Sequence, residues 1–486
     1  MKKNILNPYL PLWEYIPDGE PHVFGDRLYL YGSHDQFDGK KYCMKDYVCW
    51  SAPVDDLSDW RCEGVIYRKE QDPRHSSFFR ELWAPDVCRG SDGRYYLYYC
   101  TAWAPRIGIA VCDTPAGHYQ FYGYVTYEDG TEYGSREGDT TFDPGVLHDD
   151  GGKTWLYTAF STNNTSMIRM MGKLTGVKLY GKGNQVLGLE EDMKTIRSVK
   201  PLIPGIENAA GTGFEGHEFY EASSMRKFNG KYYCIYSSFL SHELCYAISS
   251  QPDRGFTYGG MLHSNGNIGI RGRKQASYYW GNNHGSIEYV NGRYYIFGHR
   301  QTNYNECNRQ GVAEEIFMDT NGRFLPTEMT SCGLNQGPLP AEGDYPAAVA
   351  CALFRGDGAP KVTQTSRKKK NFPMITQQLR DGIEEDSSYI TNISDYTVIG
   401  YKYFSFTAER ITLTLEIKGN AQGVLLVYQS ESMETPVGEL GIAPHRNWKR
   451  ISAKLKVEKK IAALYFVFRG KGRLDFKCLR LKGDTQ

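Results

Sequence analysis

One short pattern recurs five times in the first two thirds of this 486-residue chain. Each copy has two turn-forming residues, an Arg or Lys, and then four mainly aromatic or aliphatic residues. The copies span residues 25–31, 92–98, 151–157, 229–235 and 291–297. A repeat of about 60–75 residues with such turns and strands is typical of one four-stranded propeller blade. The pattern therefore predicts a five-bladed β-propeller over residues 1–335.

The last third of the chain is predicted to form a second β-domain. A segment rich in Pro and Gly, Gly333–Pro340, follows the last repeat and is typical of a linker or strap. Beyond it, six short segments alternate as strands do, at 397–406, 411–418, 423–429, 448–457, 462–469 and 474–481. This spacing predicts a β-sandwich over residues 345–486. The expected fold class is all-β, a propeller followed by a sandwich.

Composition narrows the classes of partner. The formal net charge is +1, so no broad electrostatic attraction to nucleic acid or anionic membrane is expected. No stretch approaches the ~20 apolar residues of a membrane span, and the N-terminus lacks the apolar core of a signal peptide. The twelve Cys include no C-x-x-C pair, so we expect reduced thiols in a cytoplasmic protein, without disulfides or a zinc site. The oligomeric state is left open.

An ionisable residue precedes the Arg or Lys of every repeat by eight to ten positions. These residues are Asp18, Asp86, Asp143, Glu221 and His284. Equivalent positions in a propeller lie at equivalent places around the central axis. Four carboxyl groups and one imidazole should therefore converge. Such a cluster of like charge costs free energy unless it is used or counterbalanced.

Two carboxyl groups are what glycoside hydrolysis requires, one to protonate the leaving oxygen and one to activate water or attack. A third can raise the pKa of the acid. A single carboxylate is more often a turn cap or a surface ion pair. Three at matched positions, Asp18, Asp143 and Glu221, favour an active site.

Several motifs within residues 5–335 resemble glycoside hydrolase family 43. They are Trp83–Asp86, Phe142–Pro144, Phe219–Ala222, and His284–Ser286 followed by Gly298–Arg300. The resemblance implies a five-bladed propeller as the catalytic domain, which hydrolyses plant cell-wall pentose glycans with inversion of configuration.

The resemblance also implies roles for individual residues. Asp18 would be the general base, Asp143 would orient the acid and tune its pKa, and Glu221 would be the general acid. The family usually shows Asp-Pro at the base, whereas here Pro21 follows Glu20. Glu20 is therefore a rival to Asp18, and on a strand the two would share a face.

Further residues are expected to bind substrate. The family has an Arg near the base, which assigns that place to Arg300, where it would clamp a sugar hydroxyl or keep a carboxylate ionised. Trp83 is expected to present an apolar face to the sugar ring, with Asp86 shaping that wall. Residues just past a blade strand are further candidates: Trp103, Phe160 and His34.

His284 has two interpretations. A lone His is often a satisfied structural residue. The family, however, often places a hydrated cation, commonly calcium, in the central tunnel with a His beside it. Calcium prefers oxygen ligands, so His284 would contact it mainly through water, and the ion would be structural or electrostatic. No organic cofactor is expected.

The C-terminal region loosely resembles a carbohydrate-binding module of the family 6 type, through Tyr401–Phe406, Trp448 and Phe466–Leu481. The segment Gly470–Phe476 offers no obvious loop Trp, so a mainly structural or weakly binding role is expected.

The prediction from sequence is an exo-acting, inverting glycosidase. It would release terminal α-L-arabinofuranosyl or β-1,4-xylosyl units from small plant cell-wall oligosaccharides. The alternatives are a non-catalytic glycan-binding propeller and a glycosidase of the same fold that acts on galactosyl groups. The choice between pentoses, the linkage and the chain length stay open.

Overall fold

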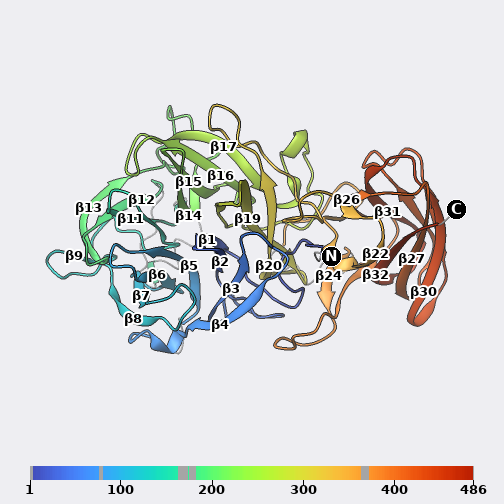
Figure 1. Cartoon of the computed structure of the whole chain (residues 1–486), viewed down its shortest axis with the longest axis horizontal. Coiled ribbons are helices and arrows are strands. Elements are labelled where there is room, and N and C mark those ends of the chain that lie inside the picture. Colours follow the sequence, from blue (N-terminus) through green and yellow to red (C-terminus); the bar gives the residue numbers. More distant parts are fainter. Residues whose placement is uncertain (1–3, 76–79, 163–172, 175–181, 363–371, 485–486) are drawn as a thin grey trace.

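The protein is described here by a computed structural model that covers residues 4–75, 80–162, 173–174, 182–362 and 372–484. It is nearly all β-structure, and five antiparallel sheets surround a common centre (Figure 1). The first two sheets are β1 (Glu20–Phe24), β2 (Arg27–Tyr31), β3 (Tyr47–Pro53) and β4 (Arg61–Tyr67), then β5 (Leu82–Arg89), β6 (Tyr95–Thr101), β7 (Gly108–Cys112) and β8 (Gln120–Tyr124).

The other three blades have the same meander order. The third is β10 (Gly145–His148), β11 (Thr154–Thr158), β12 (Gln185–Leu189) and β13 (Thr195–Pro201), with β9 (Thr126–Tyr127) added parallel at its edge. The fourth is β14 (Phe219–Phe228), β15 (Lys231–Ser238), β16 (Glu243–Ser249) and β17 (Thr257–Ser264). The fifth is β18 (Ile287–Val290), β19 (Arg293–Thr302) and β20 (Asn305–Ile316), three strands among the described residues.

The repeat is the hairpin between the first and second strands of each blade. At Asn229-Gly230 and Asn291-Gly292 both residues have positive φ, as a tight two-residue hairpin requires. The strand that follows is fully or mostly buried, because blades cover it on both sides. This explains why its residues are continuously apolar or aromatic rather than alternating.

Apolar clusters join neighbouring blades all around the ring. One cluster packs Tyr31 of the first blade against Leu97 of the second, and equivalent clusters join the second to the third, the third to the fourth and the fourth to the fifth. The ring closes where Leu30 of the first blade packs with Phe297 of the fifth. A bridge between Gly19 and Gly285 strengthens this closure. The predicted five-bladed propeller is confirmed.

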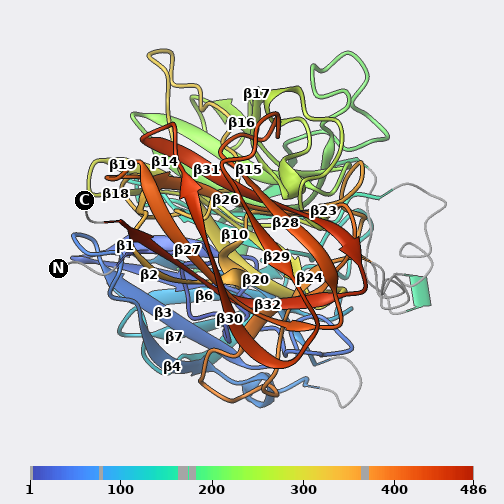
Figure 2. The same ribbon diagram turned by 90° about the vertical axis from the view of Figure 1, so that its right-hand side faces the viewer.

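The C-terminal part folds as two packed sheets (Figure 2). One sheet contains β21 (Leu339–Pro340), β26 (Thr397–Ser405), β31 (Ile461–Lys471), β28 (Gln422–Tyr428), β29 (Gly438–Ile442) and β23 (Ala352–Arg355). The other contains β24 (Met374–Gln377), β25 (Ser388–Ile393), β32 (Leu474–Gly483), β27 (Arg410–Gly419), β30 (His445–Lys456) and β22 (Gly343–Pro346). Alternate residues of β27 are buried between the sheets, as in a sandwich. The predicted β-sandwich is confirmed.

The sandwich core continues into the propeller. Leu12, Tyr304 and Val312 of the propeller belong to the same apolar cluster as the sandwich strands. Arg300 on β19 is buried and donates to the backbone carbonyls of Ala348 and Ala350, which precede β23. No helix in the described part of the chain is long and apolar enough to cross a bilayer.

Deletion of the sandwich is therefore expected to destabilise the propeller. A chain ending at Pro338 would expose Leu12, Tyr304 and Val312 to water and leave the Arg300 guanidinium without two of its acceptors. We expect the melting temperature to fall by about 10 °C or more, measured by circular dichroism. A truncated propeller that melts at the temperature of the whole chain would contradict the shared core.

Candidate active site

The ionisable residues of the repeat lie on or just before the first strand of each blade. These first strands, β1, β5, β10, β14 and β18, belong to the five sheets that surround the centre of the propeller (Figure 1). His284 lies among the ionisable residues. Its Nδ1 is 3.9 Å from Asp18 Oδ1 and 3.6 Å from Asp143 Oδ2, and its Nε2 is 3.9 Å from Glu20 Oε1. The blade positions aligned in the sequence are thus brought together in space.

Asp18 is held as a buried ion pair. Arg309 Nη1 donates to both of its carboxylate oxygens, at 2.8 and 3.1 Å, and His299 Nδ1 lies 3.4 Å away. Burial is the largest influence and would by itself raise the pKa of Asp18, but the charge of Arg309 and smaller contributions from His284, His299 and Ser33 together outweigh it and the pKa is lowered. Asp18 is therefore ionised at neutral pH, as a general base must be.

Glu221 has the opposite character. Burial, and then the charge of Asp18, raise its pKa to about 8. The pairing of β14 with β15 is irregular on both sides of Glu221, and Ala222 has a φ of 67°. Such a bulge re-aims a side chain that a regular strand would direct elsewhere. Glu221 can therefore carry a proton at neutral pH, as a general acid must.

Asp143 is linked to Glu221 through the backbone. Its Oδ2 accepts a hydrogen bond from the amide of Ala222 at 3.2 Å. Burial, then the charges of Glu221 and Asp18, raise the pKa of Asp143 well above its usual range. The resemblance to the family predicts that Asp143 tunes the pKa of Glu221. In the structure the negative charge of Asp18 raises the pKa of both Asp143 and Glu221.

Glu20, the rival base, faces a different group. Its Oε2 accepts from Arg226 Nη2 and Ser224 Oγ, each at 2.8 Å. The expectation that Asp18 and Glu20 share a strand face is wrong, because Asp18 precedes β1 and has a φ of 56°. The two carboxyls lie on opposite sides of the His284 ring, Asp18 near Nδ1 and Glu20 near Nε2.

The group around Glu20 has the composition of a cation site. Glu20, His22 and Asp86 place three potential ligand atoms within 4.8 Å of one another. Glu20 Oε1 is buried with no hydrogen-bond partner among the residues that the structure describes. Burial and the charge of Asp86 raise the pKa of Glu20 to about 8, which a nearby cation would reverse. The carboxylates of Glu20 and Asp86, with Glu20 Oε1 available as an acceptor, fit the preference of calcium for oxygen ligands.

The predicted role of Arg300 is wrong, and Arg309 holds that place. Successive residues of a strand face opposite sides, so His299 points to Asp18 and Arg300 points away, toward Gln310 and the sandwich. Arg309 lies opposite Gln301 on the paired strand β20 and shares the face of His299. The alternation of side chains along the strand at Gly298–Arg300 could have shown that His299 and Arg300 face opposite sides. The pairing with β20 was not visible in the sequence.

Two other predicted substrate contacts are structural. His34 is buried between the carbonyl of Asp46 and the carboxylate of Glu14, because its neighbours Ser33 and Asp35 take the inward face. Asp86 is buried, bonded to His22 at 2.7 Å and to the amide of Val146 at 2.8 Å. It belongs to the group around Glu20 rather than to a sugar-binding wall.

The predicted aromatic residues form one continuous row. Trp83 contacts both Trp103 and Phe142, with ring centroids 5.6 and 5.2 Å apart. Phe142 stacks on Phe160 at 4.7 Å, and the row continues through Tyr220, the residue before Glu221. Trp83, Trp103, Phe142 and Tyr220 are partly exposed. Phe142 and Tyr220, which were not predicted as substrate contacts, lie within the motifs Phe142–Pro144 and Phe219–Ala222.

The chain is similar in sequence to a known protein family and to individual known proteins. The model of the family "Glycosyl hydrolases family 43" matches residues 15–324. The chain is 46% identical over 490 residues to "Xylosidase/arabinosidase" of Thermoclostridium stercorarium, with 100% of both chains covered. It is 31% identical over 275 residues to "Xylosidase/arabinosidase 43A" of Humicola insolens, covering 51% of this chain and 80% of that one.

Solved structures are similar in fold. An arabinoxylan arabinofuranohydrolase from Bacillus subtilis, solved with cellotetraose, aligns over 99% of both chains with a TM-score of 0.51 at 17% identity. A beta-xylosidase/alpha-arabinofuranosidase from a compost microbial metagenome, solved with xylotriose, aligns over 67% of this chain and 98% of that one, with a TM-score of 0.51 at 23% identity. At these identities the likeness concerns the fold alone.

Proposed function

Because this chain belongs to glycosyl hydrolase family 43 and is a glycoside hydrolase, we propose that it releases terminal α-L-arabinofuranosyl or β-1,4-xylosyl units from small plant cell-wall oligosaccharides, with inversion of configuration. The observation that carries this mechanism is the contrast between two neighbouring carboxyls. Asp18 is ionised beside Arg309, and Glu221 has a pKa raised to about 8. The name of the full-length relative from Thermoclostridium stercorarium supports the substrate class.

In this mechanism Glu221 donates a proton to the glycosidic oxygen while Asp18 removes a proton from a water molecule. The water attacks the anomeric carbon from the face opposite the leaving group, which inverts the configuration. An inverting pair is roughly 6.5–9.5 Å apart, to leave room for this water. Asp143 orients the strand at Glu221 through the amide of Ala222, and Arg309 keeps Asp18 ionised.

The aromatic row supports recognition of a sugar ring. Partly exposed rings of Trp83, Trp103 and Tyr220 offer apolar faces, against which the C–H face of a sugar can pack. Exo-action is part of the proposal, and a single terminal sugar is the expected product from xylotriose.

We propose calcium as a structural ion near Glu20, Asp86 and His284, with His284 contacting it through water. When bound, the ion supplies positive charge that offsets the buried carboxylates. Glu20 and Asp86 are the residues that would hold it, and Asp86 Oδ1 accepts a hydrogen bond from His22 Nε2 at 2.7 Å.

We propose a mainly structural role for the sandwich, which loosely resembles a family 6 module. Its core is continuous with that of the propeller. The partly exposed ring of Trp448 has Lys418 Nζ 4.6 Å and Lys477 Nζ 5.9 Å from its centroid, so these side chains reduce its access to a glycan.

A cytoplasmic location is a further proposal, supported by twelve free cysteines.

The pH dependence of kcat/KM should reflect the contrast between the two carboxyls. Glu221 must be protonated, so activity should be present below pH 8 and lost above it. Asp18 must be ionised, and since its pKa is lowered, the acid limb should lie below the usual Asp value of about 3.9 or be replaced there by unfolding.

Arg309→Met should move the acid limb upward. Arg293→Met, which removes an exposed pair with Glu315, should move neither limb. An alkaline limb near pH 5 would contradict the assignment of Glu221.

The substrate class is tested with p-nitrophenyl α-L-arabinofuranoside, β-D-xyloside and the galactosides. Release from either pentoside is expected, and proton NMR of the first-formed sugar should show the inverted anomer. Release only from a galactoside would favour the alternative glycosidase. Binding of xylotriose without any release would favour a glycan-binding propeller. A retained anomer would refute Asp18 as a general base.

A further inference from the structure

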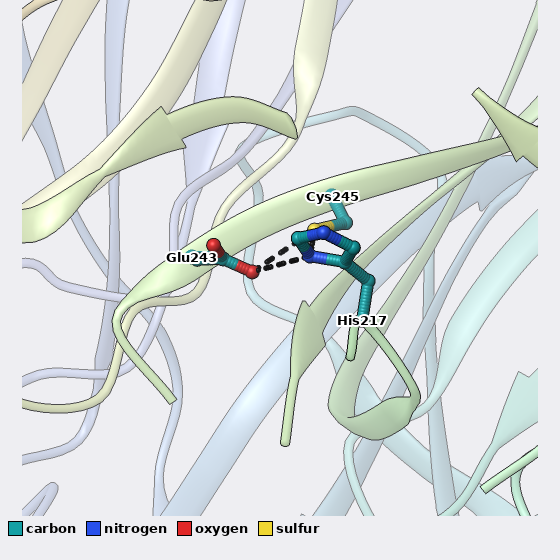
Figure 3. Close-up of side chains that lie close together, drawn as sticks. All are labelled: His217, Glu243 and Cys245. Carbon is teal, nitrogen blue, oxygen red and sulfur yellow. Dashed lines mark hydrogen bonds and ion pairs between the residues drawn. The ribbon is translucent and has the colours of Figure 1, made fainter. Parts of the chain in front are cut away.

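A second cluster of potential ligands lies in the blade that carries Glu221, outside the group of central carboxyls (Figure 3). It consists of His217, in the turn before β14, and Glu243 and Cys245 on β16. No zinc site was expected, because the chain has no C-x-x-C pair. Here the three residues come from two segments 26 or more positions apart, which no spacing rule detects.

The three ligand atoms form a compact triangle. His217 Nδ1 lies 2.9 Å from Glu243 Oε2, Cys245 Sγ lies 3.6 Å from the same oxygen, and Sγ lies 4.0 Å from Nδ1. The point equidistant from these atoms is about 2.1 Å from each, and zinc bonds to N, O and S are roughly 2.0–2.3 Å long. An ion therefore needs little movement of the three side chains.

The local structure orients each ligand. Glu243 and Cys245 are two residues apart on β16 and so share a face. Ser238 Oγ donates to Glu243 Oε2 at 2.9 Å. The His217 ring stacks on Tyr258 of β17, at 4.7 Å and an interplanar angle of 10°. Its carbonyl accepts from the hydroxyl of Tyr236 at 2.7 Å. Such outer contacts are typical of built metal sites.

The donor set selects the kind of ion. One imidazole nitrogen, one carboxylate oxygen and one thiolate sulfur match zinc and similar transition metals rather than calcium or magnesium. Three protein ligands leave one tetrahedral position for water. The side chain of His217 is 34% exposed while that of Glu243 is 7% exposed, so an ion can enter from the His217 side.

We propose that His217, Glu243 and Cys245 bind one zinc-type divalent ion, which ties the turn before β14 to β16. On binding, the ring proton of His217 moves from Nδ1 to Nε2, the hydrogen bond between His217 and Glu243 is replaced by two metal bonds, and the Cys245 thiol proton is released to solvent. Because His217 precedes Glu221 by four residues, the ion would stiffen the start of the strand that carries the general acid. The site does not depend on the proposed substrate.

The test uses the full chain after chelator treatment and Co²⁺ as a probe, in a Cys62→Ser background that removes an exposed thiol. Added Co²⁺ is expected to produce a thiolate-to-cobalt charge-transfer absorption band that saturates at one ion per chain. Zn²⁺ should displace Co²⁺ and abolish this band. The group around Glu20 contains no thiol, so it cannot produce this band. Titration with Zn²⁺ should release about one proton per ion to the buffer, from the Cys245 thiol.

Variants assign the ligands. Cys245→Ser should lose the band, and His217→Gln and Glu243→Gln should each weaken Zn²⁺ binding by about tenfold or more. Absence of the band, or a band that persists in Cys245→Ser, would overturn the site. If Cys245→Ser does not fold, the other two variants decide: unchanged Zn²⁺ affinity in both would equally overturn it.

Discussion

Replacement of Glu221 by Gln is expected to lower kcat on xylobiose or an arabino-oligosaccharide by about 1,000-fold or more, because the substitution removes the proton donated to the leaving oxygen. Gln has nearly the same volume as Glu, so sugar binding should persist. The loss should be smaller on an aryl glycoside with an acidic phenol, since that leaving group needs less protonation. The alkaline limb near pH 8 should also disappear from the remaining activity.

Glu218→Gln is the matched control for this variant. Glu218 lies in the same segment, and its carboxylate accepts a hydrogen bond from the amide of Gly216 at 3.0 Å. The side-chain oxygen of Gln can still accept this hydrogen bond, so the substitution should change kcat less than about threefold. Equal losses in the two variants would indicate a general disturbance of β14. Full activity of Glu221→Gln on oligosaccharides would remove Glu221 as the acid.

Replacement of Asp18 by Asn is expected to lower kcat by about 1,000- to 10,000-fold on every substrate, whatever the leaving group, because no carboxylate remains to activate water. The fold should survive, since Arg309 keeps its bonds to Asp35 at 2.9 and 3.0 Å. Added azide should restore part of the rate by attacking in place of water. The glycosyl azide should have inverted configuration, which proton NMR can determine.

Glu20→Gln separates the rival assignment of the base. Glu20 accepts hydrogen bonds from Arg226 and Ser224 and lies on the other side of the His284 ring from Asp18, so its replacement leaves the pair of Asp18 and Arg309 intact. Its effect on kcat should therefore be far smaller than that of Asp18→Asn. The reverse order of effects, with azide rescue of Glu20→Gln, would move the base from Asp18 to Glu20.

The repeated pattern was sufficient to predict the propeller. Each copy encodes a hairpin and a buried strand, and both features depend on local sequence: Asn-Gly pairs adopt positive φ, and aromatic runs favour strands covered on both sides. Alignment of the copies also identified Asp18, Asp143, Glu221 and His284 as neighbours. This succeeded because rotation about the propeller axis relates equivalent positions.

Predictions failed where a side chain's direction depended on tertiary pairing. Arg300 and His34 are each next in sequence to a residue whose side chain points toward the centre of the propeller. Their own side chains therefore point the other way, where Arg300 contacts Ala348 and His34 contacts Glu14. Arg309 reaches Asp18 only because β20 pairs with β19 in one register. Positive φ at Asp18 likewise separates it from Glu20, although a regular strand would have placed both on one face.

The amino-acid sequence alone determined the number of blades, the sandwich and the set of acidic residues near the axis, because short-range turn and strand preferences repeat at a regular interval. Only the tertiary structure decided which of those acids is ionised, which Arg holds it, and that His217 meets Cys245. Charge states and ligand clusters depend on burial and on distances of a few ångströms between residues far apart in the chain, and no local pattern contains those distances.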